Sequence, residues 1–151
     1  MKKIIIKTTV ISLIIILIAI SLFFGSVAIF KPSIMGNIAL NSGNEKVCVK
    51  YTEKQYIKSG DVQDLTLLAE RSIWAKDYVR AEKYITKLIL NDNFYLIEST
   101  KESGYKNYLA SSLVEALYLN GKSEKALQTA LNYYDGVSVP NTMRVIIYLF
   151  S

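Results

Sequence analysis

The side chains that most often carry out enzyme chemistry are scarce in this chain. The sequence contains no histidine and a single cysteine, Cys48. Without histidine, the commonest general base and the commonest metal ligand are both missing, so histidine-containing triads and histidine-based zinc sites are excluded. Cys48 has no imidazole partner to activate its thiol, and we expect it to be a buried structural residue.

Two pairs of carboxylates have a spacing that could place a general acid beside a general base, Asp61 with Asp64 and Glu98 with Glu102. Helix caps and solvated helix surfaces explain both pairs without a catalytic role. The sequence also lacks a glycine-rich phosphate loop, a nucleophilic serine motif and metal-ligand spacing. We therefore predict a protein that is not an enzyme and uses neither a cofactor nor a metal.

The charge of the chain does not indicate nucleic-acid binding. The sequence has 18 basic and 13 acidic residues, but three of the lysines lie among the first seven residues, which leaves 15 basic residues in the remainder. Lysine and glutamate alternate there, as in Glu82-Lys83 and Glu124-Lys125, so no basic stripe forms. We predict no nucleic-acid partner.

The N-terminal region contains an uncharged stretch, residues 8–30, that follows the three lysines. At about 1.5 Å per residue a helix of this length reaches roughly 34 Å, which is enough to cross a bilayer. Because positive flanks resist translocation, we expect residues 1–7 to be cytoplasmic and residues 31–151 to be extracytoplasmic. The prediction is a single-pass protein of the plasma membrane, with the lipid bilayer as the partner of residues 8–30.

The same stretch could instead be a secretory signal that is removed. Ser26-Val27-Ala28 has the small-x-small pattern that signal peptidase accepts, and cleavage near Ala28 would release a secreted chain beginning at Ile29. The apolar run is long for a signal core and continues to Phe30, which favours an uncleaved signal-anchor. The only cysteine is distant from residue 28, so a lipoprotein is not expected.

The rest of the chain has apolar residues at helical spacing and no sustained alternation of the strand type. Helices are expected at about residues 33–40, 45–59, 64–75, 78–90, 105–119 and 123–134. Short turns join them into hairpins at about 32–59, 62–90 and 104–135. Only Lys76-Asp77 separates the helices of the second hairpin, which requires an antiparallel arrangement. Asp61 or Asp64 could cap the start of that hairpin.

Small residues recur at a constant interval in these hairpins. Each hairpin has two of them 12 positions apart, where the helices would approach closely: Gly36 and Cys48, Ala69 and Ala81, and Val114 and Ala126. The second pair follows the first by 33 residues and the third follows the second by 45, about 11 more than a regular repeat of roughly 34. The constant spacing indicates a repeat protein.

This pattern resembles the tetratricopeptide repeat (TPR), whose motif runs large-x-x-large-small-x-x-aromatic and, after the turn, alanine-x-x-x-aromatic. The second hairpin matches it through Leu65, Leu68 and Ala69, then Ala81 and Ile85. The first and third hairpins match in part, and a generic helical-hairpin array is the alternative. The resemblance covers roughly residues 32–136 and implies an all-α fold, an α-solenoid of about three hairpins after the transmembrane helix.

Two segments fall outside the repeat. Asn91 to Gly104 accommodates the additional 11 residues, and its polar character favours a solvated extension over a functional loop. The segment 140–151 starts at Pro140 and carries the apolar residues of a last helix. We expect that helix to cap the open end of the solenoid, and contact with a partner or with the bilayer is the alternative.

The resemblance implies that the chain binds a protein or peptide through the inner face of the first helix of each hairpin. Carried over position by position, the candidate binding residues are Asn37 and Asn41, Glu70 and Trp74, and Glu115 and Tyr118. Amides can bond an extended backbone, carboxylates attract basic side chains, and aromatic rings supply rigid contact area. The alternative is purely structural, with solvated carboxylates and a core tryptophan near a turn.

Two hypotheses about function follow from different classes of protein. The first is a membrane-anchored, non-enzymatic scaffold or adaptor that binds a partner at the bacterial cell envelope. The second is a small membrane immunity or protective protein whose span and terminal helix block a toxin or pore in the bilayer. The isoleucine-, lysine- and asparagine-rich composition is typical of an AT-biased bacterial genome and suits both.

Overall fold

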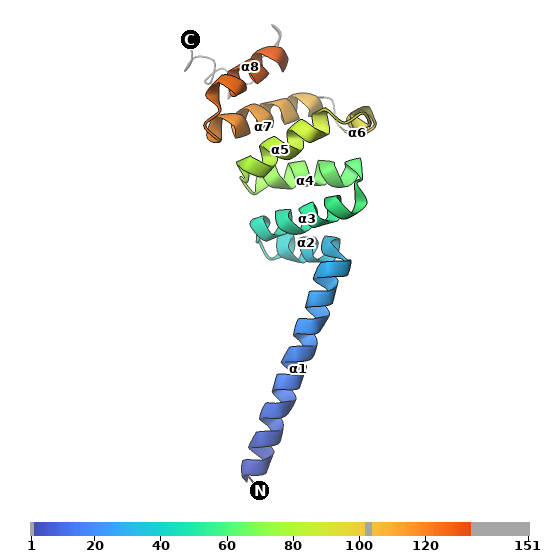
Figure 1. Cartoon of the computed structure of the whole chain (residues 1–151), viewed down its shortest axis with the longest axis vertical. Coiled ribbons are helices and arrows are strands. Elements are labelled where there is room, and N and C mark those ends of the chain that lie inside the picture. Colours follow the sequence, from blue (N-terminus) through green and yellow to red (C-terminus); the bar gives the residue numbers. More distant parts are fainter. Residues whose placement is uncertain (1, 102–103, 134–151) are drawn as a thin grey trace. The chain divides into compact units, whose positions relative to one another are not determined.

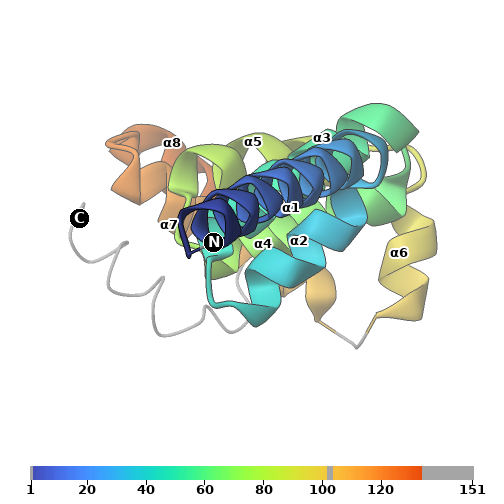
Figure 2. The same cartoon turned by 90° about the horizontal axis from the view of Figure 1, so that it is seen from below.

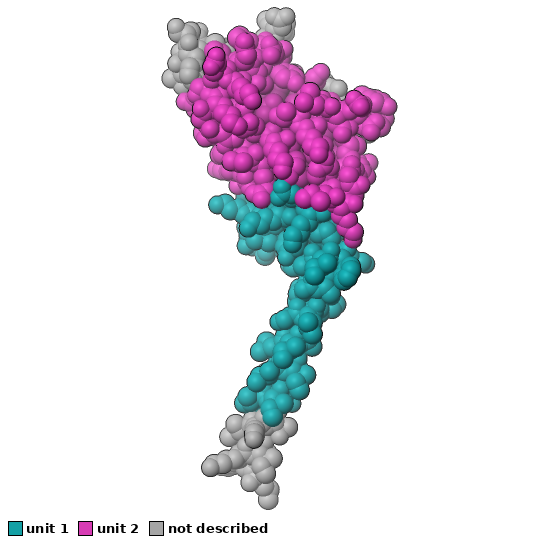
Figure 3. Space-filling view, viewed as in Figure 1, with its two compact units in different colours: residues 1–55 teal, residues 56–151 magenta. Residues whose placement is uncertain are grey.

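The computed structural model describes residues 2–101 and 104–133, together with their side chains except for those of residues 2–8 and 98–100 (Figure 1). Every regular element in the described part of the chain is an α-helix, which confirms the all-α prediction there. The helix expected within 140–151 lies outside the described residues, as does the end of the third hairpin at 134–135. The chain divides into two compact units, residues 1–55 and 56–151 (Figure 3).

The first unit begins with α1 (Lys2–Phe30), the long apolar helix. Within it, Thr9–Phe30 is a 22-residue stretch that is long and apolar enough to cross a membrane, and none of it is buried against the protein. A signal sequence near the N-terminus has the same properties. The structure therefore confirms an apolar N-terminal helix of sufficient length.

Two shorter helices follow in the first unit, α2 (Pro32–Asn41) and the start of α3 (Glu45–Ser59). Pro32 suits the first position of α2, because a proline lacks an N–H that would have no partner there. The turn between the helices needs a left-handed residue, which Gly43 supplies with φ +72°, and the Asn44 N–H donates to the Ala39 carbonyl at 2.8 Å. Cys48 is only 1 % exposed, as expected for a structural cysteine.

The second unit contains the hairpin of α4 (Val62–Trp74) and α5 (Tyr78–Ile89), which contact each other. Asp61 caps α4, since its carboxylate accepts the Gln63 N–H at 2.9 Å, and this settles the choice between Asp61 and Asp64. The apolar residues that the two helices turn towards each other are fully buried, namely Leu65, Leu68, Ala69, Ala81, Ile85 and Leu88. Their spacing at three or four residues explains both helices.

A second hairpin of the same unit consists of α7 (Tyr105–Leu119) and α8 (Ser123–Tyr133), and α7 also contacts α5. Gly121 has φ +75°, and the Lys122 N–H donates to the Leu117 carbonyl at 2.9 Å, so the turn closes α7 with a left-handed residue. Leu109, Val114, Ala126 and Ala130 are fully buried in this hairpin.

The segment between the two hairpins corrects one prediction. Instead of a solvated extension, the structure has a short helix, α6 (Phe94–Thr100), which contacts α4. Phe94 and Ile97 are each only 7 % exposed. They lie three residues apart and therefore share one side of a helix, which buries both. Because the residues after Ile97 are polar, the sequence pattern did not indicate a helix at this short apolar pair.

Candidate functional site

The candidate site is the face where side chains of α4 meet side chains at the start of α7, here called the α4–α7 face. Glu70 and Trp74 lie one turn apart on α4 and so project in similar directions. The Tyr105 hydroxyl donates to Glu70 Oε1 at 3.0 Å. The Trp74 side chain lies near that of Tyr108, whose pKa it acts to lower. The face thus combines a carboxylate with three aromatic rings.

The Glu70 carboxylate is already paired with a lysine of the chain itself. Lys101 Nζ lies 2.8 Å from Glu70 Oε1 and 5.1 Å from the centre of the Tyr105 ring. A carboxylate and an aromatic face together favour a cation, through charge and through the quadrupole of the ring. The α4–α7 face therefore binds an ammonium group in the structure.

The tyrosines of this face keep their protons across the physiological range. Burial raises the pKa of Tyr105 well above its ordinary value of 10, and the neighbouring charge of Glu70 raises it further. Burial and the Glu70 charge also raise the pKa of Tyr108. Both phenols are therefore neutral and can act as hydrogen-bond donors.

A hollow of about 370 Å³ adjoins Glu70 on the side of α6. Its lining combines acidic, amide, hydroxyl and apolar groups from both helices: Gln63, Asp64, Thr66, Leu67, Glu70, Ile97 and Lys101. Because α6 provides one side of this hollow, the segment expected to be solvated is part of the candidate site.

The structure brings together two of the six predicted binding residues, Glu70 and Trp74. Trp74 is 55 % exposed, so the alternative of a core tryptophan is wrong. Glu115 is exposed on α7, seven residues after Tyr108 and so on nearly the same side of that helix. Tyr118 is half-buried and lies ten residues after Tyr108, which turns it about 80° away from this side.

The other two predicted residues, Asn37 and Asn41, lie in the first unit. Both are exposed on α2 and lie one turn apart. Ile34 and Ile38 lie on the same side of the helix and are also exposed.

Sequence reasoning missed three members of the site, Lys101, Tyr105 and Tyr108. Tyr108 had a detectable signal, since it precedes Glu115 by two helical turns on the predicted binding side of α7. Lys101 had none, because it contacts a carboxylate 31 residues earlier in the chain.

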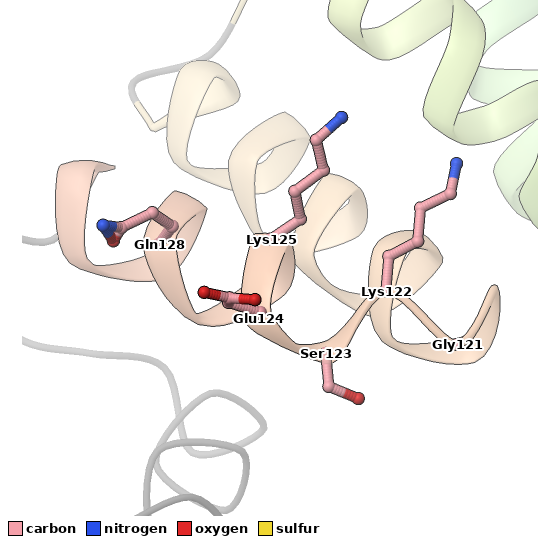
Figure 4. Close-up of a pocket in the computed structure, with 6 residues that line it drawn as sticks. All are labelled: Gly121, Lys122, Ser123, Glu124, Lys125 and Gln128. Carbon is pink, nitrogen blue, oxygen red and sulfur yellow. The ribbon is translucent and has the colours of Figure 1, made fainter.

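A second hollow, of about 570 Å³, lies at the start of α8 (Figure 4). Figure 4 shows the Lys122 and Lys125 side chains extending away from Glu124 and Gln128. Lys122 Nζ forms an ion pair with Glu82 Oε1 at 2.7 Å, so this lysine links the turn before α8 to α5 and is already paired within the chain. The hollow beside Glu70 is therefore the better candidate for a site.

The described residues contain no group of three or more histidine, cysteine, aspartate or glutamate side chains that could hold a metal. No protein-family model, curated protein or solved structure matches the chain. The inference about function therefore depends on the helical fold, the apolar helix α1 and the chemistry of the α4–α7 face.

Proposed function

We propose that this chain is a membrane-anchored, non-enzymatic scaffold or adaptor at the bacterial cell envelope. In this proposal α1 crosses the plasma membrane with its N-terminus in the cytoplasm, and residues 31–151 form an extracytoplasmic, TPR-like α-solenoid. The α4–α7 face binds a protein or peptide partner. The observation that carries the proposal is an exposed tryptophan one helical turn from a carboxylate that binds a lysine ammonium and a tyrosine hydroxyl.

The composition of the face supports a protein partner. Tryptophan and tyrosine dominate the binding energy of many interfaces, because they bury a large area at a small entropic cost. Trp74 and Tyr108 are both partly exposed although large and aromatic. Both rings therefore offer rigid contact area that a partner can cover.

The charge of the face supports a basic residue in the partner. Glu70 binds the ammonium of Lys101, and Glu115 is an exposed carboxylate further along the same side of α7. An arginine or lysine of a partner would pair with Glu115, or would exchange with Lys101 at Glu70 and stack on Tyr105.

The test is capture of a partner by the membrane-bound full-length chain and by the double variant Glu70→Gln with Trp74→Ala. We expect capture to fall by roughly 30-fold or more, the effect of removing one interface anchor. Val79→Ala is the matched control, because Val79 is 71 % exposed on α5, outside the face. Circular dichroism should show unchanged helicity in both variants. Undiminished capture by the folded double variant would contradict the proposal.

A second comparison separates the scaffold from the bilayer-blocking alternative. A chain whose residues 8–30 are replaced by an unrelated transmembrane helix should capture the partner as well as the natural chain. Activity that depends on the sequence of α1, rather than on its presence, would instead favour an immunity protein that acts within the bilayer.

A further inference from the structure

One side of α2 exposes branched apolar side chains. Ile34 is 43 % and Ile38 45 % exposed, and they lie one turn apart on the same side of the helix. The opposite side of α2 carries Pro32, Gly36 and Ala39, all of which are buried. The helix as a whole has no charged residue. Its exposed side is therefore apolar with two amides.

The start of α2 is held close to the end of the apolar helix. Lys31 alone separates α1 from α2 (Figures 1 and 2). The Lys31 N–H donates to the Val27 carbonyl at 2.8 Å, and the Ile34 N–H donates to the Lys31 carbonyl at 3.1 Å. Contacts between α1 and α2 add to this connection. The backbone bonds leave little freedom for α2 to move away from the end of α1.

The charge of this region suits contact with phospholipid. The first acidic residue of the chain is Glu45, and Lys31 is the one charged residue between positions 8 and 44. Anionic headgroups attract lysine and repel carboxylates. Lys31, at the junction of α1 and α2, would lie at the level of the headgroups when α1 crosses the bilayer.

We propose that α2 lies on the outer surface of the bilayer, with Ile34 and Ile38 inserted at the boundary between headgroups and acyl chains. An apolar helix side adjoining a membrane span is typical of interfacial helices. The inference rests on the proposed crossing of α1. It assigns Asn37 and Asn41 to the headgroup layer, where amides bond to phosphate and ester oxygens, instead of to a peptide groove.

The experiment uses the full-length chain in vesicles of phosphatidylethanolamine and phosphatidylglycerol. Cys48 is the only cysteine and is buried, so Cys48→Ala provides a background in which single cysteines can be labelled with an environment-sensitive fluorophore. The labelled positions are Ile34→Cys and Ile38→Cys, with Leu17→Cys in the middle of α1 as the membrane reference. Val79→Cys on α5 is the exposed apolar control.

Brominated acyl chains should quench the labels at 34, 38 and 17 clearly more than the label at 79. If the label at 17 is quenched but the labels at 34 and 38 are quenched no more than the label at 79, the inference is overturned. The membrane crossing of α1 would still stand. Protection of 34 and 38 from a water-soluble quencher without quenching by the lipid would show that protein covers them, which also overturns it. An unquenched label at 17 would refute the membrane crossing itself.

Discussion

Glu70 accepts hydrogen bonds from two donors at the candidate site, the Lys101 ammonium and the Tyr105 hydroxyl. Both bonds end on the same oxygen, Oε1. Its side chain is 15 % exposed, so water screens these interactions less than at an open surface. The carboxylate both stabilises the local structure and raises the pKa of Tyr105. Substitutions at Glu70 can therefore be followed through that tyrosine.

The first prediction concerns Glu70→Gln. Removing the negative charge and keeping the shape should lower the pKa of Tyr105 towards its ordinary value of 10, although burial still raises it. An alkaline titration followed by tyrosine absorbance should show Tyr105 and Tyr108 ionising at a lower pH than in the natural chain, and in a Tyr105→Phe background only the Tyr108 part of this change should remain. Glu124→Gln on α8 is the control. A titration unchanged by Glu70→Gln would contradict the assigned hydrogen bond.

Glu82 connects α5 to the turn before α8. Asn120 Nδ2 donates to Glu82 Oε2 at 2.9 Å and to the Tyr78 carbonyl at 3.1 Å, while Lys122 Nζ donates to Glu82 Oε1 at 2.7 Å. Burial alone would raise the pKa of Glu82, but the hydrogen bonds from Lys122 and Asn120, together with the positive charges of Lys122 and Lys125, outweigh it and lower the pKa below its ordinary value of 4.5.

The second prediction follows from the lowered pKa of Glu82. A carboxylate with a lowered pKa contributes stability above its unfolded pKa, and loses this contribution as the pH falls through its folded value. Glu82→Gln should therefore reduce the free energy of unfolding at pH 7 by about 1 kcal/mol and have less effect at pH 3. Urea denaturation at both pH values measures this. An equal loss of unfolding free energy at pH 7 and at pH 3 would contradict the role assigned to the Glu82 charge.

At the scale of the helices, local pattern explains most of the structure. The helices α2 to α5, α7 and α8 begin and end within a few residues of the predicted bounds, because their apolar residues recur every three or four positions. The pairing of Glu70 with Trp74 follows from helical spacing alone. By contrast, α6 depends on packing against α4, and Lys101 reaches Glu70 across 31 residues, so neither is visible in a local window.

The third prediction tests whether α6 is a packed element. Phe94→Ala and Ile97→Ala should each reduce the free energy of unfolding by about 2–4 kcal/mol, because each removes a buried apolar side chain and leaves a cavity. Tyr95→Ala is the control, since Tyr95 is 63 % exposed, and should change the stability by less than about 0.5 kcal/mol. Equal, small effects at all three positions would mean that α6 is not packed.

At the scale of the whole molecule, the proposal combines an apolar N-terminal helix with a helical region that carries the binding face. The fourth prediction is that the full-length chain stays in the membrane fraction of a bacterial host, with residues 31–151 open to external protease. Mass spectrometry of membrane and secreted fractions measures this. A secreted chain that begins at Ile29 would mean that α1 is a signal that is removed.

The most direct test of the binding face is photo-crosslinking in intact bacterial cells. A photoreactive amino acid is placed at position 74 on α4 or at 115 on α7, and at 79 on α5 as the control. We predict that positions 74 and 115 form a covalent adduct with the same protein in the membrane fraction, and that position 79 does not. No adduct at 74 and 115, or an equal adduct at 79, would contradict a partner bound at the α4–α7 face.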